Sequence, residues 1–95
     1  MKIKENSFIA KIAAKKLNSN SMAITIGSTI HLCNTSRQAF LSDERWVRHE
    51  MQHVKQFKRY GFIRFLFMYT WESLRHGYYN NKWEKEARDA EDEIK

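Results

Sequence analysis

The stretch that decides the fold is Glu44–Tyr60, ERWVRHEMQHVKQFKRY, with the motif His49-Glu50-Met51-Gln52-His53 at its centre. The polar pair Ser42-Asp43 supplies an N-cap before it, and Gly61 follows its end, so we expect a helix from there to about Tyr60. At about 100° per residue, the two histidines of the motif lie one turn apart on one helix face. Both imidazoles can therefore reach the same metal ion.

The histidine face of this helix is otherwise apolar, with Trp46, Val54 and Phe57 beside the motif. Gln52 points the opposite way, together with the basic residues Arg48, Lys55 and Arg59, which we expect to be solvated surface. The motif side chains should thus point into the protein. Burying two histidines and a glutamate costs desolvation free energy, which a bound metal ion would offset. The inward face argues against the simpler alternative of two surface histidines at this spacing by chance.

Before this helix, two β-rich runs, Met22–Ile26 and Thr29–Cys33, flank the pair Gly27-Ser28, which suits a type II′ turn. This predicts a β-hairpin that sets Thr25 opposite Ile30, Ala23 opposite Leu32 and Ile24 opposite His31. A lone hairpin is marginal in water, so it must pack on helices. Earlier still, Asn6-Ser7 precedes an amphipathic pattern that predicts a short helix to about Leu17.

After the motif helix, the chain predicts two more helices. Phe62 to about Arg75 is apolar almost all round, and we expect it to be buried centrally. The alternative is an exposed patch that meets a partner, a second copy or a membrane surface. Asn80-Asn81 then caps a helix from Lys82 to about Ile94, whose apolar stripe is Trp83, Ala87, Ala90 and Ile94.

These elements predict a mostly helical α+β fold, with the hairpin packed on the motif helix, as one domain over residues 1–95. A hydrophobic content of 42% argues against disorder. The single cysteine, Cys33, favours a reducing cytoplasm. We find no signal-peptide pattern, and the longest apolar run is about half the ~20 residues that span a bilayer. The net charge of +6 is scattered, so we expect no nucleic-acid partner and at most weak membrane-surface contact; the oligomeric state stays open.

A catalytic zinc site takes three protein ligands and leaves one position for water. The acidic last helix is the obvious source of the third ligand. Glu84 lies at the edge of its apolar stripe and Glu91 on nearly the same bearing two turns later, whereas Glu86 and Asp89 point more outward. Glu84 is our choice, with Glu91 and Glu86 as alternatives.

The motif helix followed by a helix carrying Glu84-Lys85-Glu86-Ala87 resembles the gluzincin metallopeptidases. The resemblance extends from Thr25 to Glu91, and it implies a small zincin-like hydrolase with Zn²⁺ as its cofactor. It assigns His49, His53 and Glu84 as ligands and Glu50 as the catalytic general base. In that family an Asp commonly follows the ligand Glu by four residues and orients a histidine. Arg88 stands there, so Asp89, Glu91 or a backbone carbonyl would have to substitute.

The implied activity is zinc-dependent hydrolysis of a peptide or protein substrate. Such sites usually add a group that steadies the oxyanion, for which His76, Tyr78 and Tyr79 are candidates. The edge of the hairpin could pair with an extended peptide, which resembles the edge strand of the same superfamily. The rival function is a non-catalytic zinc-binding or protein-interaction domain that keeps the ligands. The substrate and its cleavage preference stay open.

Overall fold

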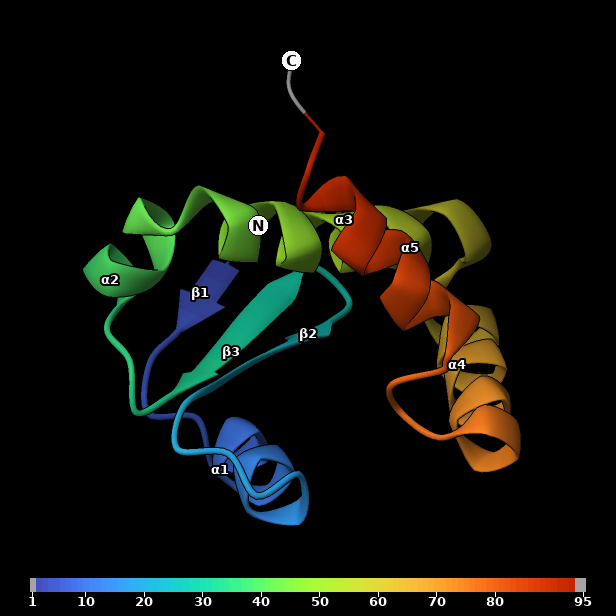
Figure 1. Ribbon diagram of the computed structural model, residues 1–95, viewed down its shortest axis with the longest axis horizontal. Coiled ribbons are helices and arrows are strands. Elements are labelled where there is room, and N and C mark those ends of the chain that lie inside the picture. The colour runs from blue at the N-terminus through green and yellow to red at the C-terminus, as the bar shows by residue number, and fades with distance from the viewer. Residues whose placement is uncertain (1, 94–95) are drawn as a thin grey trace.

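The computed structural model describes residues 2–93, in which three strands and five helices follow one another along the chain. A small sheet lies at one end and α4 and α5 at the other, with α3 running between them (Figure 1). The strands are β1 (Lys2–Lys4), β2 (Met22–Ile26) and β3 (Thr29–Cys33). The helices are α1 (Phe8–Lys16), α2 (Arg37–Ser42), α3 (Glu44–Tyr60), α4 (Phe62–His76) and α5 (Lys82–Ala90). The mostly helical α+β prediction is confirmed.

The sheet has the order β1-β3-β2, so β3 is its centre and β2 one of its edges. The antiparallel β2–β3 hairpin has the expected register, with Thr25 opposite Ile30 and Ala23 opposite Leu32. Gly27 begins the turn at φ +66°, as a type II′ turn requires. The sequence did not predict β1, which pairs in parallel with β3 and turns the hairpin into a three-stranded sheet.

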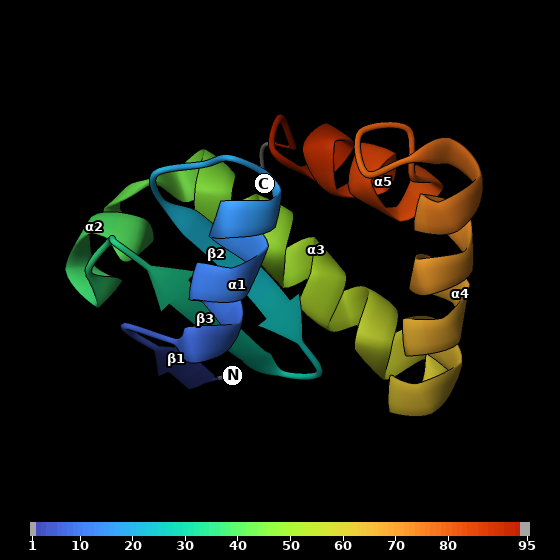
Figure 2. The ribbon, with the colours of Figure 1, turned by 90° about the horizontal axis from the view of Figure 1, so that it is seen from below.

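The two faces of the sheet pack against different helices. On one face Ala23, Ile30 and Leu32 form a core with Phe40 of α2, and α3 adds Trp46, Val47 and Val54 to it. On the other face Cys33 packs on Ala10 and Ala14 of α1, which crosses the sheet (Figure 2). The period-2 alternation of the hairpin therefore fixes which strand residues look toward the motif helix. Thr25 is among them.

Helix α3 has the ends that the sequence predicts. Asp43 is its N-cap, and its carboxylate accepts a hydrogen bond of 3.1 Å from the Trp46 amide. Gly61 ends it at φ +88°, ψ +152°, a conformation that is essentially restricted to glycine. This sharp turn leads directly into α4, where Phe65 joins Phe57 of α3 and Trp83 of α5 in a second aromatic core.

The expectation that α4 is buried centrally is wrong. Of its side chains only Phe65 is buried, while Phe67, Trp71 and Leu74 are 74%, 60% and 79% exposed. The reason is its position at the end of the molecule, where α3 and α5 cover only part of its surface (Figure 2). None of the described helices combines the length and the apolarity that crossing a membrane needs.

Helix α5 starts at the predicted cap but ends early. The Asn81 carboxamide accepts a hydrogen bond from the Trp83 amide, and Trp83, Ala87 and Ala90 form the buried stripe. The helix ends at Ala90 rather than near Ile94, which lies outside the described residues. Beyond Ala90 the chain turns, and this turn brings Glu91 back toward α3.

Asn81 anchors α5, so replacing it should destabilise the protein. It is fully buried, and its amide nitrogen donates to the Tyr69 carbonyl (3.1 Å) and to Ser73 Oγ (2.8 Å) of α4. We expect Asn81→Ala to lower the free energy of unfolding by about 2–4 kcal/mol, because it removes a cap and leaves buried partners unpaired. Urea unfolding of the metal-free protein measures this. A loss below about 0.5 kcal/mol, the range of surface substitutions, would contradict it.

Candidate metal centre

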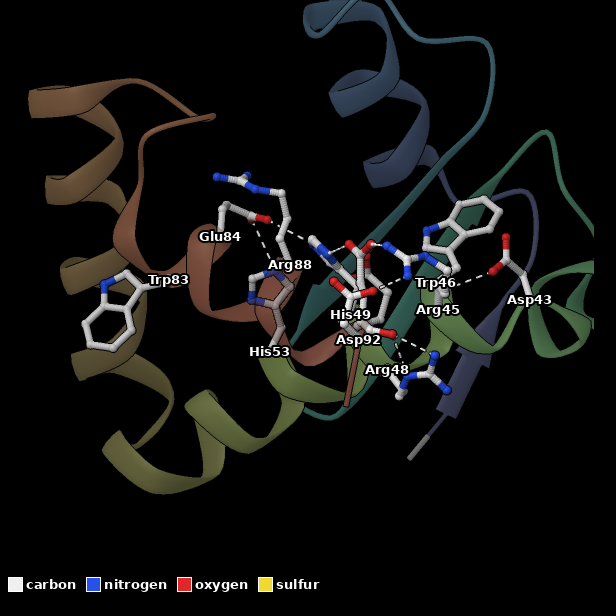
Figure 3. Close-up of polar contacts among 12 residues, drawn as sticks. Asp43, Arg45, Trp46, Arg48, His49, His53, Trp83, Glu84, Arg88 and Asp92 are labelled. Atoms are coloured by element: carbon white, nitrogen blue, oxygen red, sulfur yellow. Dashed lines mark hydrogen bonds and ion pairs between the residues drawn. The ribbon is translucent and has the colours of Figure 1, made fainter. Parts of the chain in front are cut away.

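The two motif histidines of α3 and one glutamate of α5 converge on a single point (Figure 3). His49 Nε2 lies 3.0 Å from Glu84 Oε1, and His53 Nε2 lies 3.1 Å from Glu84 Oε2. One ligand atom from each of the three side chains lies within 4.8 Å of the others, so the group could hold a metal ion. The i, i+4 spacing on α3 and the apolar stripe of α5 bring these side chains together.

The second ring nitrogen of each imidazole, Nδ1, lies within hydrogen-bond distance of a side-chain oxygen. His49 Nδ1 lies 2.7 Å from Glu91 Oε2, and His53 Nδ1 lies 2.8 Å from Gln56 Oε1. The orientation of the Gln56 amide is consistent with its own donors, because its nitrogen donates to the Trp83 carbonyl and to Glu86 Oε1. Each Nδ1 thus carries its hydrogen toward an acceptor, which leaves Nε2 free to bind a metal.

The donor set fits a divalent cation. Both rings face acceptors on both nitrogens, and an imidazole can donate at both only when it carries a positive charge. Burial disfavours that charge, but Glu84, Glu50 and Glu91 outweigh it and raise the pKa of His49 to about 9. Burial also opposes ionisation of Glu84, yet its bonds to His49 and His53 hold its pKa well below the usual value. A metal ion between the Nε2 atoms and Glu84 would supply the same positive charge.

Glu50 lies beside this group with its carboxylate in a defined place. It is 4% exposed, and Oε1 accepts a 2.8 Å hydrogen bond from Thr25 Oγ1 of β2. Burial raises the pKa of its carboxyl above the ordinary value, against the opposing effect of His53 and His49. A carboxylate of raised pKa next to a metal position is suited to accept and return a proton.

Two tyrosines complete the surroundings. The Tyr69 hydroxyl of α4 donates a hydrogen bond to Glu84 Oε2. Burial raises the pKa of Tyr69, and the negative charge of Glu84 raises it further. Tyr78 lines the same cleft as Glu50. The other two oxyanion candidates lie elsewhere: His76 is close to Glu72 on the exposed side of α4, and Tyr79 is 71% exposed with the Arg88 guanidinium 4.2 Å above its ring.

Two arginines of α3 hold the end of α5. Arg48 donates from Nε (2.9 Å) and Nη2 (2.6 Å) to the Glu91 carbonyl, and Arg45 pairs with the Glu91 and Asp92 carboxylates. Arg48 and Gln52 are only partly exposed, because the end of α5 packs against them and Gln52 donates a hydrogen bond to Glu86. Lys55 and Arg59 are exposed as expected.

The structure places each possible third ligand separately. Glu84 faces both Nε2 atoms, Glu91 contacts the Nδ1 side of His49, and Glu86 bonds the amides of Gln52 and Gln56. Arg88 donates to the Tyr79 carbonyl. Among the groups that could replace the expected Asp, Glu91 is the one that contacts a motif histidine, at His49 Nδ1. Sequence reasoning missed Thr25, Gln56 and Tyr69. Only Gln56 had a signal, its i+3 spacing from His53.

The site opens into a cleft with two recesses. One is a cavity of about 270 Å³ between β2 and α4, and Glu50, His53 and Glu84 all line it. The other, of about 380 Å³, includes Glu50 and His49 and extends toward the start of α3. A ligand held at the three converging side chains would thus have space on either side.

Comparison with known proteins identifies one family. No curated protein and no solved structure matches the chain. The family model of the eCIS core domain matches residues 5–61, well over half of the 95 residues. The match covers α1, the sheet hairpin and the whole motif helix, and it ends before α4 and α5. The chain therefore belongs to the eCIS core domain family, named for the extracellular contractile injection system.

Proposed function

We propose that the protein is a zinc-dependent peptidase in which His49, His53 and Glu84 bind the metal and Glu50 is the general base. The observation that carries the proposal is the convergence of three metal-ligating side chains next to a buried, hydrogen-bonded carboxylate. Two imidazoles and one carboxylate are the donor set of many catalytic zinc sites, which keep a fourth position for water. This is also the set that the gluzincin resemblance implies.

Each residue of the site has a role in hydrolysis. A zinc ion held by His49, His53 and Glu84 would acidify a water and polarise the carbonyl of the scissile bond. Glu50 would take a proton from the attacking water and return it to the amine nitrogen as the C–N bond breaks. Thr25 holds the glutamate in place through its hydroxyl. Tyr78, in the same cleft, donates a hydrogen bond to the developing oxyanion.

The edge of the sheet supports a peptide as the substrate. Among the described strands β2 pairs only with β3, and its residues line the cleft that contains Glu50. An extended chain can add to such an edge through main-chain hydrogen bonds, which hold any sequence in register. The peptide bond would then lie across the metal position.

A second function, a binding domain that keeps the metal but cleaves nothing, draws support from α4. Its exposed apolar side chains form a surface of the kind that contacts other proteins. The family name suggests that any such partner belongs to an injection system, and we infer that the chain acts in one. The buried, unpaired Cys33 is compatible with the cytoplasmic location we propose.

Peptide cleavage by the zinc-loaded chain tests the proposal. A mixture of random peptides is incubated with the protein, with and without one equivalent of zinc, and products are read by mass spectrometry. We expect cleavage that depends on zinc and stops with a chelator. Zinc-loaded protein that cuts no peptide would contradict the enzymatic proposal and leave the binding domain.

Glu91 should strengthen zinc binding indirectly, through its contact with Nδ1 of the ligand His49. Replacing it by Gln removes the charge that holds Nδ1, so we expect Glu91→Gln to weaken zinc binding about 10–100-fold, as such outer partners do. Competition with a chelating dye measures the affinity. Asp89→Asn, at an exposed residue near the end of α5, is the matched control and should change the affinity little. Equal affinities for the two variants would remove Glu91 from the site.

A further inference from the structure

The cleft consists of two unequal halves that meet at Glu50. Four residues line both halves: Met22, Ala23, Glu50 and Tyr78. The half toward α4 is a cavity of about 270 Å³ with mostly apolar walls. The half toward the start of α3 is lined by polar groups that include Ser19, Ser21, Asp43, Arg45 and Glu91. A substrate that crosses Glu50 therefore meets different chemistry on its two sides.

The edge of β2 runs along the apolar half. All five residues of Met22–Ile26 line it, although alternate residues of a strand point to opposite faces. A cavity that contacts every residue of a strand borders its backbone edge. A segment paired to that edge would direct alternate side chains toward the cavity.

Besides β2, the apolar side chains of this half come from three helices or the residues next to them. Leu17 follows α1, Phe57 belongs to α3, and Phe65 and Leu66 belong to α4. Leu17 and Leu66 are each about two-fifths exposed, so apolar side chains also form the mouth. Among the described residues that line this half, none is Lys or Arg, and the acidic ones are Glu50 and Glu84.

We propose that the apolar half binds a large, uncharged apolar side chain next to the bond that is cut. The substrates are then extended segments with Leu, Ile, Met or Phe on one side of that bond and no such requirement on the other. This rests on the proposed peptidase function and names its substrate class.

Apolar, acidic and basic side chains would differ in the free energy of binding to this cavity. Burying a leucine-sized group favours binding by about tenfold or more over alanine. An Asp or Glu would have to give up its hydration in the same place, where the described lining has no Lys or Arg to pair with it. A Lys or Arg would have to give up its hydration in an apolar cavity.

The test is the sequence around the cuts made in a random peptide mixture by the zinc-loaded full chain. We expect one flanking position to be enriched about tenfold or more in large apolar residues and depleted in Asp and Glu. Leu66→Ala removes one wall and should reduce this preference several-fold, with the fold checked by circular dichroism. Leu74→Ala is the matched control, since Leu74 lies on the same helix, is 79% exposed and lines neither half. Equal use of all residues at both positions would overturn the proposal.

A binding measurement separates this proposal from the enzymatic one. Small hydroxamates anchor at a zinc ion and can carry a methyl, isobutyl or carboxymethyl group. We expect the isobutyl compound to bind about tenfold or more tightly than the methyl one, and Leu66→Ala to reduce that ratio. If no peptide is cut but this ratio holds, peptidase activity fails and the apolar site stands. Equal affinities, or no binding of any hydroxamate, would overturn the apolar site.

Discussion

The variant Glu50→Gln should bind zinc as the natural chain does and lose peptide cleavage by about 10³-fold or more. General acid–base catalysis contributes about 10²–10⁴-fold, and Glu50 both accepts the proton of the water and returns it to the amine. The amide of Gln keeps the size of the side chain, and its oxygen can still accept the Thr25 hydroxyl at the position of Oε1. The fold and the three ligands should therefore persist.

The measurement is kcat/KM on a cleaved peptide together with zinc content for both proteins. Thr25→Val is the companion variant, because it keeps the shape of the side chain and removes the hydroxyl that holds Glu50. We expect it to lose less activity than Glu50→Gln. Cleavage that Glu50→Gln leaves unchanged would refute the assignment of the base.

Glu84→Gln should abolish tight zinc binding. Its two oxygens face His49 Nε2 and His53 Nε2, and an amide lacks the negative charge that the metal needs there. We expect the zinc affinity to fall by more than about 100-fold. This exceeds the loss of about 10–100-fold that is typical when a residue that only hydrogen-bonds to a ligand is replaced. Zinc at 100 times its dissociation constant should stabilise the natural chain by about 2.7 kcal/mol. The variant should lose this stabilisation.

Glu86→Gln is the matched control for the third ligand. Glu86 is on the same helix but accepts from the amides of Gln52 and Gln56, away from both Nε2 atoms. We expect its zinc affinity to stay within a few-fold of that of the natural chain, measured by the same dye competition. Tight binding by Glu84→Gln together with a large loss in Glu86→Gln would exchange the two roles.

Local patterns account for the parts of the fold that the sequence predicts. The Gly27-Ser28 turn sets the hairpin register, and Asp43 and Asn81 are caps whose side chains bond the first amides of α3 and α5. Strand β1 escaped prediction because its pairing with β3 depends on residues far along the chain. Its three residues, Lys-Ile-Lys, give no local strand signal.

The exposure of α4 shows a limit of composition as a guide. A helix rich in Phe, Leu and Trp suggests burial, but a chain of 95 residues has too few elements to cover it on every side. The site residues also divide into those that a local pattern predicts and those that it does not. Helical periodicity predicted that His49, His53 and Glu84 face one another, and it also pointed to Glu91. Thr25 and Tyr69 reach the site through contacts between distant segments, which no local pattern shows.

The zinc content of the purified protein tests the central claim most directly. The chain is stripped with a chelator, equilibrated with zinc, freed of excess metal and analysed by mass spectrometry beside His49→Ala and His53→Ala. The convergence of His49, His53 and Glu84 predicts one zinc ion per chain and far less in either variant. A natural chain that retains no zinc, or variants that retain as much as it does, would contradict the metal centre.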